Sequence, residues 1–333
     1  MLHDRKVNGK SFPQGPDGSD SPYLYEMLMP SGSGKRKMKP WQGIVVFVCL
    51  LVLFQLIGSL MFLVMGIYAN GVAEMLFFFG GSLLTVRLLK LDIRDVFPVK
   101  KPGIQGILGT FLIWFGAYQC MSAISLVLAY LFPKAYMAVG NSMNSFVTGL
   151  PFLGSVIVIA LVPAVSEEML HRGLLQYSLQ PLKRRWLILT CMGIYFGVFH
   201  LSLIRFLPMM FLGMVIAWLR QETDNMIYGV LFHFINNFFA LAVTFLSEQA
   251  AGTVTSVRYS GLPLYLLGYY FLMAAAGPFL MYVGGWLVKR CVSQCRMPLF
   301  HGNRRQIKVL AAATIVLAAA GIILFAAGIC MIF

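Results

Sequence analysis

Two adjacent glutamates, Glu167 and Glu168, lie within a long apolar stretch and are the first residues of the chain that could do chemistry. Arg172 follows Glu168 by four residues, so we expect the two side chains to share a helical face and form an internal ion pair. Glu167 points about 100° away, because an α-helix has about 3.6 residues per turn. We therefore expect Glu168 and Arg172 to brace the structure, and Glu167 to face another neighbour and take a proton from water.

Two histidine blocks follow along the chain, each with a spacing of four residues. The first runs from Phe196 to His200, and the second runs from His233 to Asn237. Because His233 and Asn237 fall on one helical face, an imidazole and a carboxamide can project together into a bundle. Amide hydrolysis requires a base for water, a proton shuttle and donors to the tetrahedral oxygen, which these residue types can supply. His200 and His233 could instead bind a divalent metal such as zinc, although no HExxH signature is present.

Several of these residues also have a purely structural interpretation. His200 by itself is more typical of a packed or interfacial histidine, and Asn237 by itself is typical of hydrogen bonding between membrane helices. His171 lies one turn after Glu167 and could tune it, but its place near the predicted helix end favours an interfacial histidine at least as strongly, so it is left out of the core set. The paired glutamates differ, because an ionisable group at mid-membrane costs roughly 2.5–3.5 kcal/mol and Arg172 accounts for only one of them.

The composition of the chain predicts that membrane helices position these residues. Of its 333 residues, 59% are hydrophobic and 11% are charged, whereas soluble domains contain about 25% charged residues. The apolar stretches predict an all-α, polytopic transmembrane bundle of eight or nine helices with an intramembrane active site. The fifth and sixth spans are short, so one of them could be a tilted or incomplete crossing. The nine candidate spans are 42–68, 72–89, 103–132, 152–178, 186–203, 205–220, 226–247, 262–288 and 308–332.

The basic residues predict the orientation of these spans. With a cytosolic N-terminus, 22 of the 26 Lys and Arg residues lie on the cytosolic side, and Lys134, Arg205 and Arg258 lie on the opposite side. This distribution follows the positive-inside rule and favours a multi-pass protein of the cell membrane. It also argues against nucleic-acid binding, because the net charge of +14 is spread over membrane loops rather than gathered on one surface.

Two domains are predicted on these grounds. Residues 1–40, rich in Gly, Pro, Ser and charge, predict a disordered cytosolic tail, and residues 41–333 predict the helical membrane domain. Among the acidic residues, Glu167 and Glu168 are taken to be the ones well inside a span. Cys291 and Cys295, which lie beside basic residues, are assigned no role.

The three polar blocks, in this order, resemble the CPBP family of intramembrane proteases, which includes the type II CAAX prenyl endopeptidase and the bacteriocin-processing or immunity (Abi) relatives. The resemblance covers a core of about residues 110–250. It is carried by the patterns EExxxR, FxxxH and HxxxN, which appear here as Glu167, Glu168 and Arg172; Phe196 and His200; and His233 and Asn237.

The resemblance implies a role for each of these residues. Glu167, assisted by His200, would activate the attacking water, and His233 and Asn237 would stabilise the oxyanion or help to hold a metal. Glu168 and Arg172 would brace the site. In the predicted topology Glu167 lies more than halfway across, nearer the cytosol, while His200 lies nearer the outside. We reconcile the two by expecting the fifth helix to be short and sunk into the bundle.

The expected activity is endopeptidase cleavage of a membrane-associated or lipid-modified peptide within the lipid bilayer. Two other hypotheses use the same residues. A non-catalytic, peptide-binding or immunity protein would keep the fold without cutting, and a proton- or metal-coupled transporter would use the buried Glu and His as a relay. Inverted internal repeats would favour the transporter, and the sequence contains none that is evident by inspection.

Overall fold

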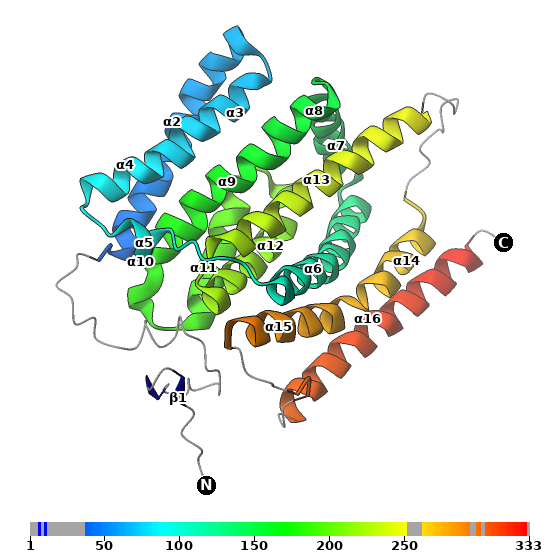
Figure 1. Cartoon of the computed structure of the whole chain (residues 1–333). Helices are drawn as coiled ribbons and strands as arrows, with labels where there is room; N and C mark the ends of the chain where they lie inside the picture. Colours follow the sequence, from blue (N-terminus) through cyan, green and yellow to red (C-terminus); the bar gives the residue numbers. More distant parts are fainter. Residues whose placement is uncertain are drawn as a thin grey trace.

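The computed structural model of the chain describes residues 6–7, 10–11, 37–251, 262–293, 298–300 and 304–331. Within these ranges, eight helical segments are long and apolar enough to cross a membrane (Figure 1). The predicted all-α, polytopic bundle is therefore confirmed. The predicted tail, residues 1–40, lies mostly outside the described residues; its described part includes β1 (Lys6–Val7) and β2 (Lys10–Ser11), which pair antiparallel.

Three of the membrane-length segments are interrupted helices, and the other five are single helices. The interrupted segments are α3 (Tyr68–Glu74), η1 (Met75–Gly80) and α4 (Gly81–Leu88); α8 (Phe152–Ser155), η2 (Val156–Leu161), α9 (Val162–Glu168), η3 (Met169–Leu175), α10 (Gln176–Leu179) and η4 (Gln180–Leu182); and α14 (Leu264–Ala274) with α15 (Gly277–Ser293). The single helices are α2 (Pro40–Met65), α6 (Ile104–Leu131), α12 (Leu203–Thr223), α13 (Met226–Ala251) and α16 (Arg304–Cys330).

Shorter helices complete the described part of the chain. The predicted fifth span corresponds to α11 (Arg185–Phe199), whose 15 residues extend about 22 Å and are too short to cross about 30 Å of hydrocarbon directly. Residues 133–151 fall between two predicted spans, and α7 (Pro133–Thr148) occupies most of them. Polar residues interleaved with its apolar ones hide this helix from a search for membrane spans. A single turn, α5 (Ile93–Val96), is capped by Asp92, which accepts the Arg94 backbone N–H at 2.9 Å.

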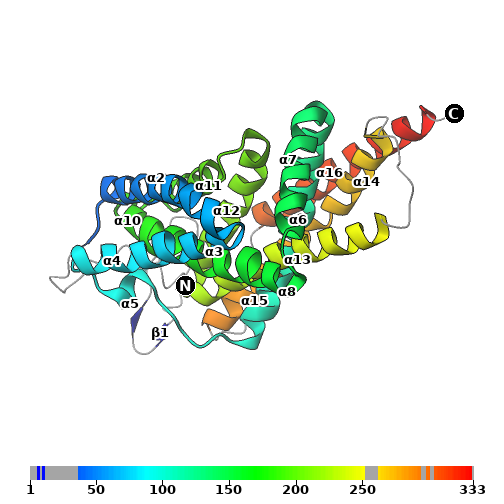
Figure 2. The same ribbon diagram turned by 90° about the horizontal axis from the view of Figure 1, so that it is seen from above.

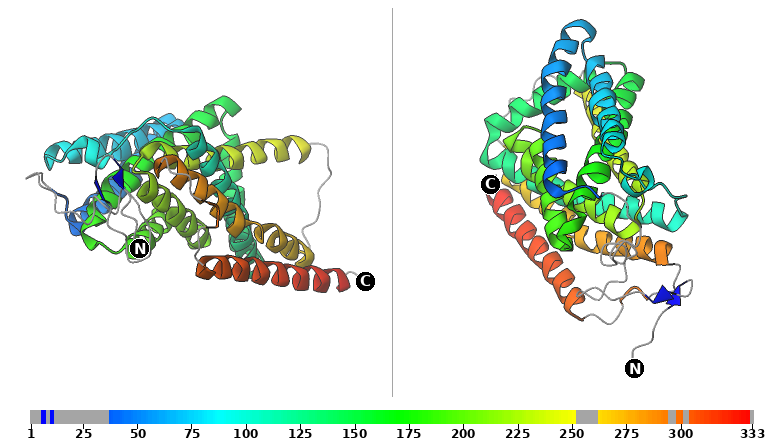
Figure 3. Two further views of the ribbon diagram at one scale, coloured as in Figure 1. Left: turned by 60° about the horizontal axis from the view of Figure 1, so that its bottom comes forward. Right: turned by 90° about the vertical axis from the view of Figure 1, so that its left-hand side faces the viewer.

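The segment from α8 to η4 lies at the centre of the bundle. Figures 1 and 2 show α2 at one edge and α16 at the opposite edge, with α9, α12 and α13 between them. Figure 3 shows α16 running along the outside against α14. Half of the most apolar window in the central segment is buried, compared with 6% in α2 and in α16. Polar side chains on the central segment are therefore enclosed by other helices instead of facing lipid.

The α11–α12 hairpin packs closely because glycine lies at the crossing. A methyl group on Gly213 of α12 would come within 2.6 Å of Phe196 Cβ and 3.1 Å of Gly193 Cα in α11. Close approach at small residues is typical of packing between membrane helices. At the open end of this hairpin, Glu222 of α12 forms an ion pair with Arg185 of α11. Glu222 also pairs with Lys289, which joins the hairpin to α15.

Candidate active site

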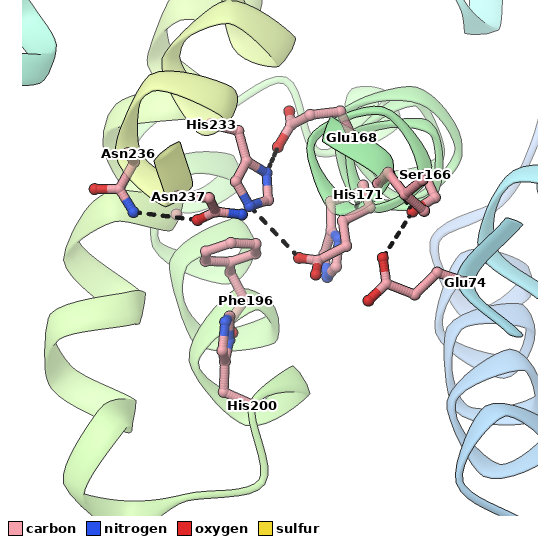
Figure 4. Close-up of polar contacts among 12 residues, drawn as sticks. Glu74, Ser166, Glu168, His171, Phe196, His200, His233, Asn236 and Asn237 are labelled. Carbon is pink, nitrogen blue, oxygen red and sulfur yellow. Dashed lines mark hydrogen bonds and ion pairs between the residues drawn. The ribbon is translucent and has the colours of Figure 1, made fainter. Parts of the chain in front are cut away.

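Glu168 lies at the centre of a buried network of charged side chains. Arg172 Nη1 donates to Glu168 Oε1 at 2.8 Å, which is the ion pair that the four-residue spacing predicts. His233 Nδ1 lies 3.0 Å from the same oxygen and ties α13 to the central segment (Figure 4). Gly229 makes this approach possible, because a methyl group there would lie 3.0 Å from Glu168 Oε2. Glu168 therefore fixes the positions of both Arg172 and His233.

Glu167 faces the other nitrogen of the same imidazole. Its Oε2 lies 3.9 Å from His233 Nε2, beyond hydrogen-bond distance. No hydrogen-bond partner for this oxygen exists in the described part of the chain, and the residue is 7% exposed. The adjacent carboxylates thus have separate environments, as helical geometry predicts. Glu167 lies midway along the helical segment 152–182.

His200 reaches the site from the end of the short helix α11. Its Nδ1 lies 2.8 Å from the Phe196 carbonyl oxygen one turn earlier, so Nδ1–H can donate and Nε2 remains to accept. The Phe196 ring stands between two imidazoles, with ring centroids 4.9 Å from His200 and 5.7 Å from His233 (Figure 4). Phe196 therefore spaces the two histidines and covers one side of each ring.

Asn237 donates a hydrogen bond to the carbonyl oxygen of Ile159, four residues before Pro163. Pro163 has no N–H to donate to the carbonyl of Ile159 four residues earlier, and Asn237 Nδ2 donates to that oxygen at 3.4 Å. Asn236 Nδ2 in turn donates to Asn237 Oδ1 at 3.4 Å. One amide hydrogen of Asn237 therefore joins α13 to the central segment, which supports its structural interpretation, and the second remains for another acceptor.

A cavity of about 470 Å³ lies within the bundle, where these side chains meet. Glu167, His200, His233 and Asn237 line it, together with Phe196. Glu168 and Arg172 lie behind this wall, so four of the six predicted site residues line the cavity and two support them. Aromatic and Met side chains form much of the remaining lining, which makes the cavity mostly apolar with a polar wall on one side.

The comparison with protein families agrees with this geometry. Residues 149–239 match the model of a family described as type II CAAX prenyl endopeptidase Rce1-like. This segment is CAAX protease-like. The predicted resemblance is thereby confirmed, and the matched range contains all six predicted site residues. No curated protein and no solved structure gives a significant match. The family match points to a protease, and the eight membrane-length helices place it in a lipid bilayer.

The cavity also contains a carboxyl group outside the CAAX protease-like segment. Glu74 of α3 is 4% exposed and lines the cavity. Asn70 Nδ2 donates to its Oε1 at 2.8 Å, and Ser166 Oγ lies 3.0 Å from its Oε2. Sequence reasoning passed over Glu74 because it lies only two residues inside the span drawn from residue 72. The four-residue spacing from Asn70 to Glu74 is the signal that could have found it.

Two further basic residues lie close to the site. Arg205, the first residue of the predicted sixth span, lies in the first turn of α12, where Ser202 caps the helix by accepting the Arg205 backbone N–H at 3.4 Å. Its side chain lines the cavity and contacts Met143 Sδ at 3.7 Å. His171 is fully buried rather than interfacial, with Nδ1 2.8 Å from the Glu167 carbonyl oxygen. Its ring packs among aromatic side chains.

His200 and His233 are the predicted metal ligands. His200 and His233 both line the cavity, but no group of three His, Cys, Asp or Glu side chains within the described residues is placed to hold an ion. The assignment of these two histidines as zinc ligands therefore stays a prediction. Cys291 lies 3.8 Å from Tyr228 Oη and is not among the residues lining the cavity, while Cys295 falls outside the described residues.

Proposed function

We propose that the chain is an intramembrane endopeptidase that hydrolyses a peptide bond in a membrane-associated or lipid-modified peptide. The observation that carries the proposal is that Glu167, His200 and His233, from three separate segments, line one cavity within a helical bundle. Such a cavity offers water a polar wall inside an otherwise apolar space. Its apolar remainder suits a substrate whose side chains or lipid group partition into the membrane.

Glu167 is the proposed base in this reaction. It takes a proton from water while the water oxygen attacks the peptide carbonyl carbon, and His200 Nε2 accepts a hydrogen bond that orients the same water. Glu168 holds His233 through Nδ1, so Nε2 faces the cavity and, when it carries a hydrogen, can donate there. There it donates to the developing oxyanion, together with the second amide hydrogen of Asn237. Arg172 maintains the charge and position of Glu168.

The experiment compares wild-type protein with Glu167→Gln in lipid nanodiscs. A farnesylated peptide and the same peptide without the lipid are incubated with each protein, and mass spectrometry identifies the cleaved bond. We expect cleavage by the wild type and a loss of about 10²–10⁴-fold in Glu167→Gln, the usual contribution of a general base. Asp95→Asn, which changes an exposed acid, is the matched control and should cleave normally.

Two outcomes would separate this proposal from its rivals. Full cleavage by Glu167→Gln would show that another group activates water. Binding of the peptide by wild-type protein without any cleavage would favour the non-catalytic peptide-binding hypothesis. The comparison of lipidated with unmodified peptide shows directly whether the lipid group contributes to recognition.

We also propose that the N-terminus faces the cytosol in the cell membrane. Support comes from the Lys and Arg residues, most of which fall on the cytosolic side of that topology. An N-terminal epitope tag should be inaccessible to antibody in intact cells and accessible after permeabilisation. Antibody labelling of intact cells would show instead that the N-terminus faces the outside of the cell.

A further inference from the structure

Glu74 approaches the CAAX protease-like segment from α3, beside the proposed base. Its partner Ser166 directly precedes Glu167, and Figure 4 shows Glu74 beside Ser166, joined to it by a hydrogen bond. Glu74 and Glu167 line the same cavity. Within the described residues Glu74 takes part in no ion pair; its contacts are with the hydroxyl of Ser166 and the amide of Asn70. A carboxyl group enclosed in this way is far less costly when it is neutral.

The contacts of Ser166 indicate where the proton lies. Its hydroxyl group has one hydrogen, yet Oγ lies 2.8 Å from the Val162 carbonyl oxygen and 3.0 Å from Glu74 Oε2. If Glu74 were ionised, both oxygens would be acceptors competing for the same hydrogen. Both contacts become hydrogen bonds when Glu74 Oε2–H donates to Ser166 and Ser166 donates to Val162. The geometry therefore fits a Glu74 that holds a proton at the cavity wall.

We propose that Glu74 is the general acid that protonates the leaving amine, an inference that rests on the proposed endopeptidase function. The water oxygen bonds to the carbonyl carbon as Glu167 takes one water hydrogen. The carbon–nitrogen bond then breaks, its electron pair stays on nitrogen, and nitrogen takes the hydrogen from Glu74. The products are an amine and a carboxylic acid. The hydrogen on Glu167 returns to Glu74 through cavity water, which restores both groups for the next turnover.

Two substitutions distinguish this role from a structural one. Glu74→Gln keeps both hydrogen bonds, because the amide nitrogen can donate to Ser166 and the amide oxygen can accept from Asn70, but it has no proton to transfer. Glu74→Leu removes the hydrogen bonds as well. If Glu74 only joins α3 to the central segment, Glu74→Gln retains activity and Glu74→Leu does not. If Glu74 is the acid, both variants lose activity although Glu74→Gln melts at the wild-type temperature.

The leaving group provides a second readout that a structural role would not change. The substrates are a peptide and its ester analogue at the same scissile bond, since a departing alkoxide needs less protonation than a departing amine. For Glu74→Gln we expect kcat to fall by about 10²–10⁴-fold on the amide and by less than about tenfold on the ester. Wild-type rates in Glu74→Gln, or equal losses on amide and ester, would overturn the inference. Inactivity of the wild type on both substrates would instead reject the proposed function, and this inference with it.

Discussion

Replacing Arg172 with leucine tests whether the buried ion pair braces the site. The Arg172 and Glu168 side chains are 1% and 0% exposed, and their charged atoms lie 2.8 Å apart. The guanidinium also donates to the Gly213 carbonyl oxygen at 3.2 Å and lies 4.6 Å from the Phe196 ring centroid. Arg172 thus joins the central segment to α11 and α12. Its loss leaves the Glu168 carboxylate buried without a cation from its own helix.

The expected cost follows from what remains around Glu168. Removing one partner of a buried ion pair typically destabilises a protein by about 3–5 kcal/mol. His233 Nδ1 stays 3.0 Å from Glu168 Oε1, so we expect the lower end of that range. A loss of about 3 kcal/mol lowers the folding equilibrium constant roughly 10²-fold. The double variant Glu168→Leu/Arg172→Leu leaves neither charge alone and should recover most of the loss.

The assay is reversible unfolding of the purified variants in mixed micelles, followed by circular dichroism. Wild type, both single variants and the double variant complete a double-mutant cycle, which isolates the coupling between the two side chains. The reasoning is refuted if Arg172→Leu is within about 0.5 kcal/mol of wild type, the range of an ordinary surface substitution. It is also refuted if the double variant is less stable than Arg172→Leu.

Three further predictions concern the rest of the site. His200→Gln should lower the rate of peptide cleavage by about 10²-fold with an unchanged melting temperature, because its ring lines the cavity and bonds only locally to Phe196; a matching fall in stability would contradict this. Arg185→Met should lower the melting temperature in mixed micelles without changing KM, because its partner Glu222 joins helix ends that do not line the cavity. Elemental analysis of purified wild type and His200→Gln tests the zinc prediction: about one zinc ion per chain in the wild type, lost in the variant, is expected if His200 and His233 hold a metal, and zinc well below that in the wild type would contradict it.

Local relationships within the site were predictable from sequence. The Glu168–Arg172 pair depends on a spacing of four residues, which a helix converts into contact whatever surrounds it. The ion pair forms even though π-helical turns flank α9 on both sides. The shortness of α11 was also predictable, because its apolar stretch is limited by Arg185 at one end and His200 at the other. These features require knowledge of one helix at a time.

The residues missed by sequence reasoning depend on contacts between helices. Glu74 and Ser166 are 92 positions apart, and only the packing of α3 against α9 brings them together. Arg205 carries a charge at a helix start, where the sequence is equally compatible with a loop facing water. A hydropathy pattern treats each span separately and reports neither which face is enclosed nor which neighbour it meets. The chemistry of the cavity wall therefore had to come from the structure.

The buried glutamates at the site, Glu74, Glu167 and Glu168, have different hydrogen-bond partners, which separate a structural role from a chemical one. Glu168 is held by a cation and an imidazole, and Glu74 by an amide and a hydroxyl, whereas Glu167 Oε2 has no hydrogen-bond partner within the described residues. Glu→Gln substitution should therefore act differently at each position. Glu168→Gln leaves Arg172 without a counter-charge and should cost about 3 kcal/mol of stability.

The other two Glu→Gln variants should keep their stability and lose activity. Glu74→Gln preserves the hydrogen bonds of a neutral carboxyl group, and Glu167→Gln removes a charge whose contact with His233 Nε2, at 3.9 Å, is longer than a hydrogen bond. Unfolding and peptide cleavage are measured for all three variants. If the roles are separate, Glu168→Gln loses stability, whereas Glu74→Gln and Glu167→Gln lose cleavage activity at wild-type stability. Equal destabilisation at the three positions would mean that the glutamates form one structural cluster, and the separate roles assigned to them would then be wrong.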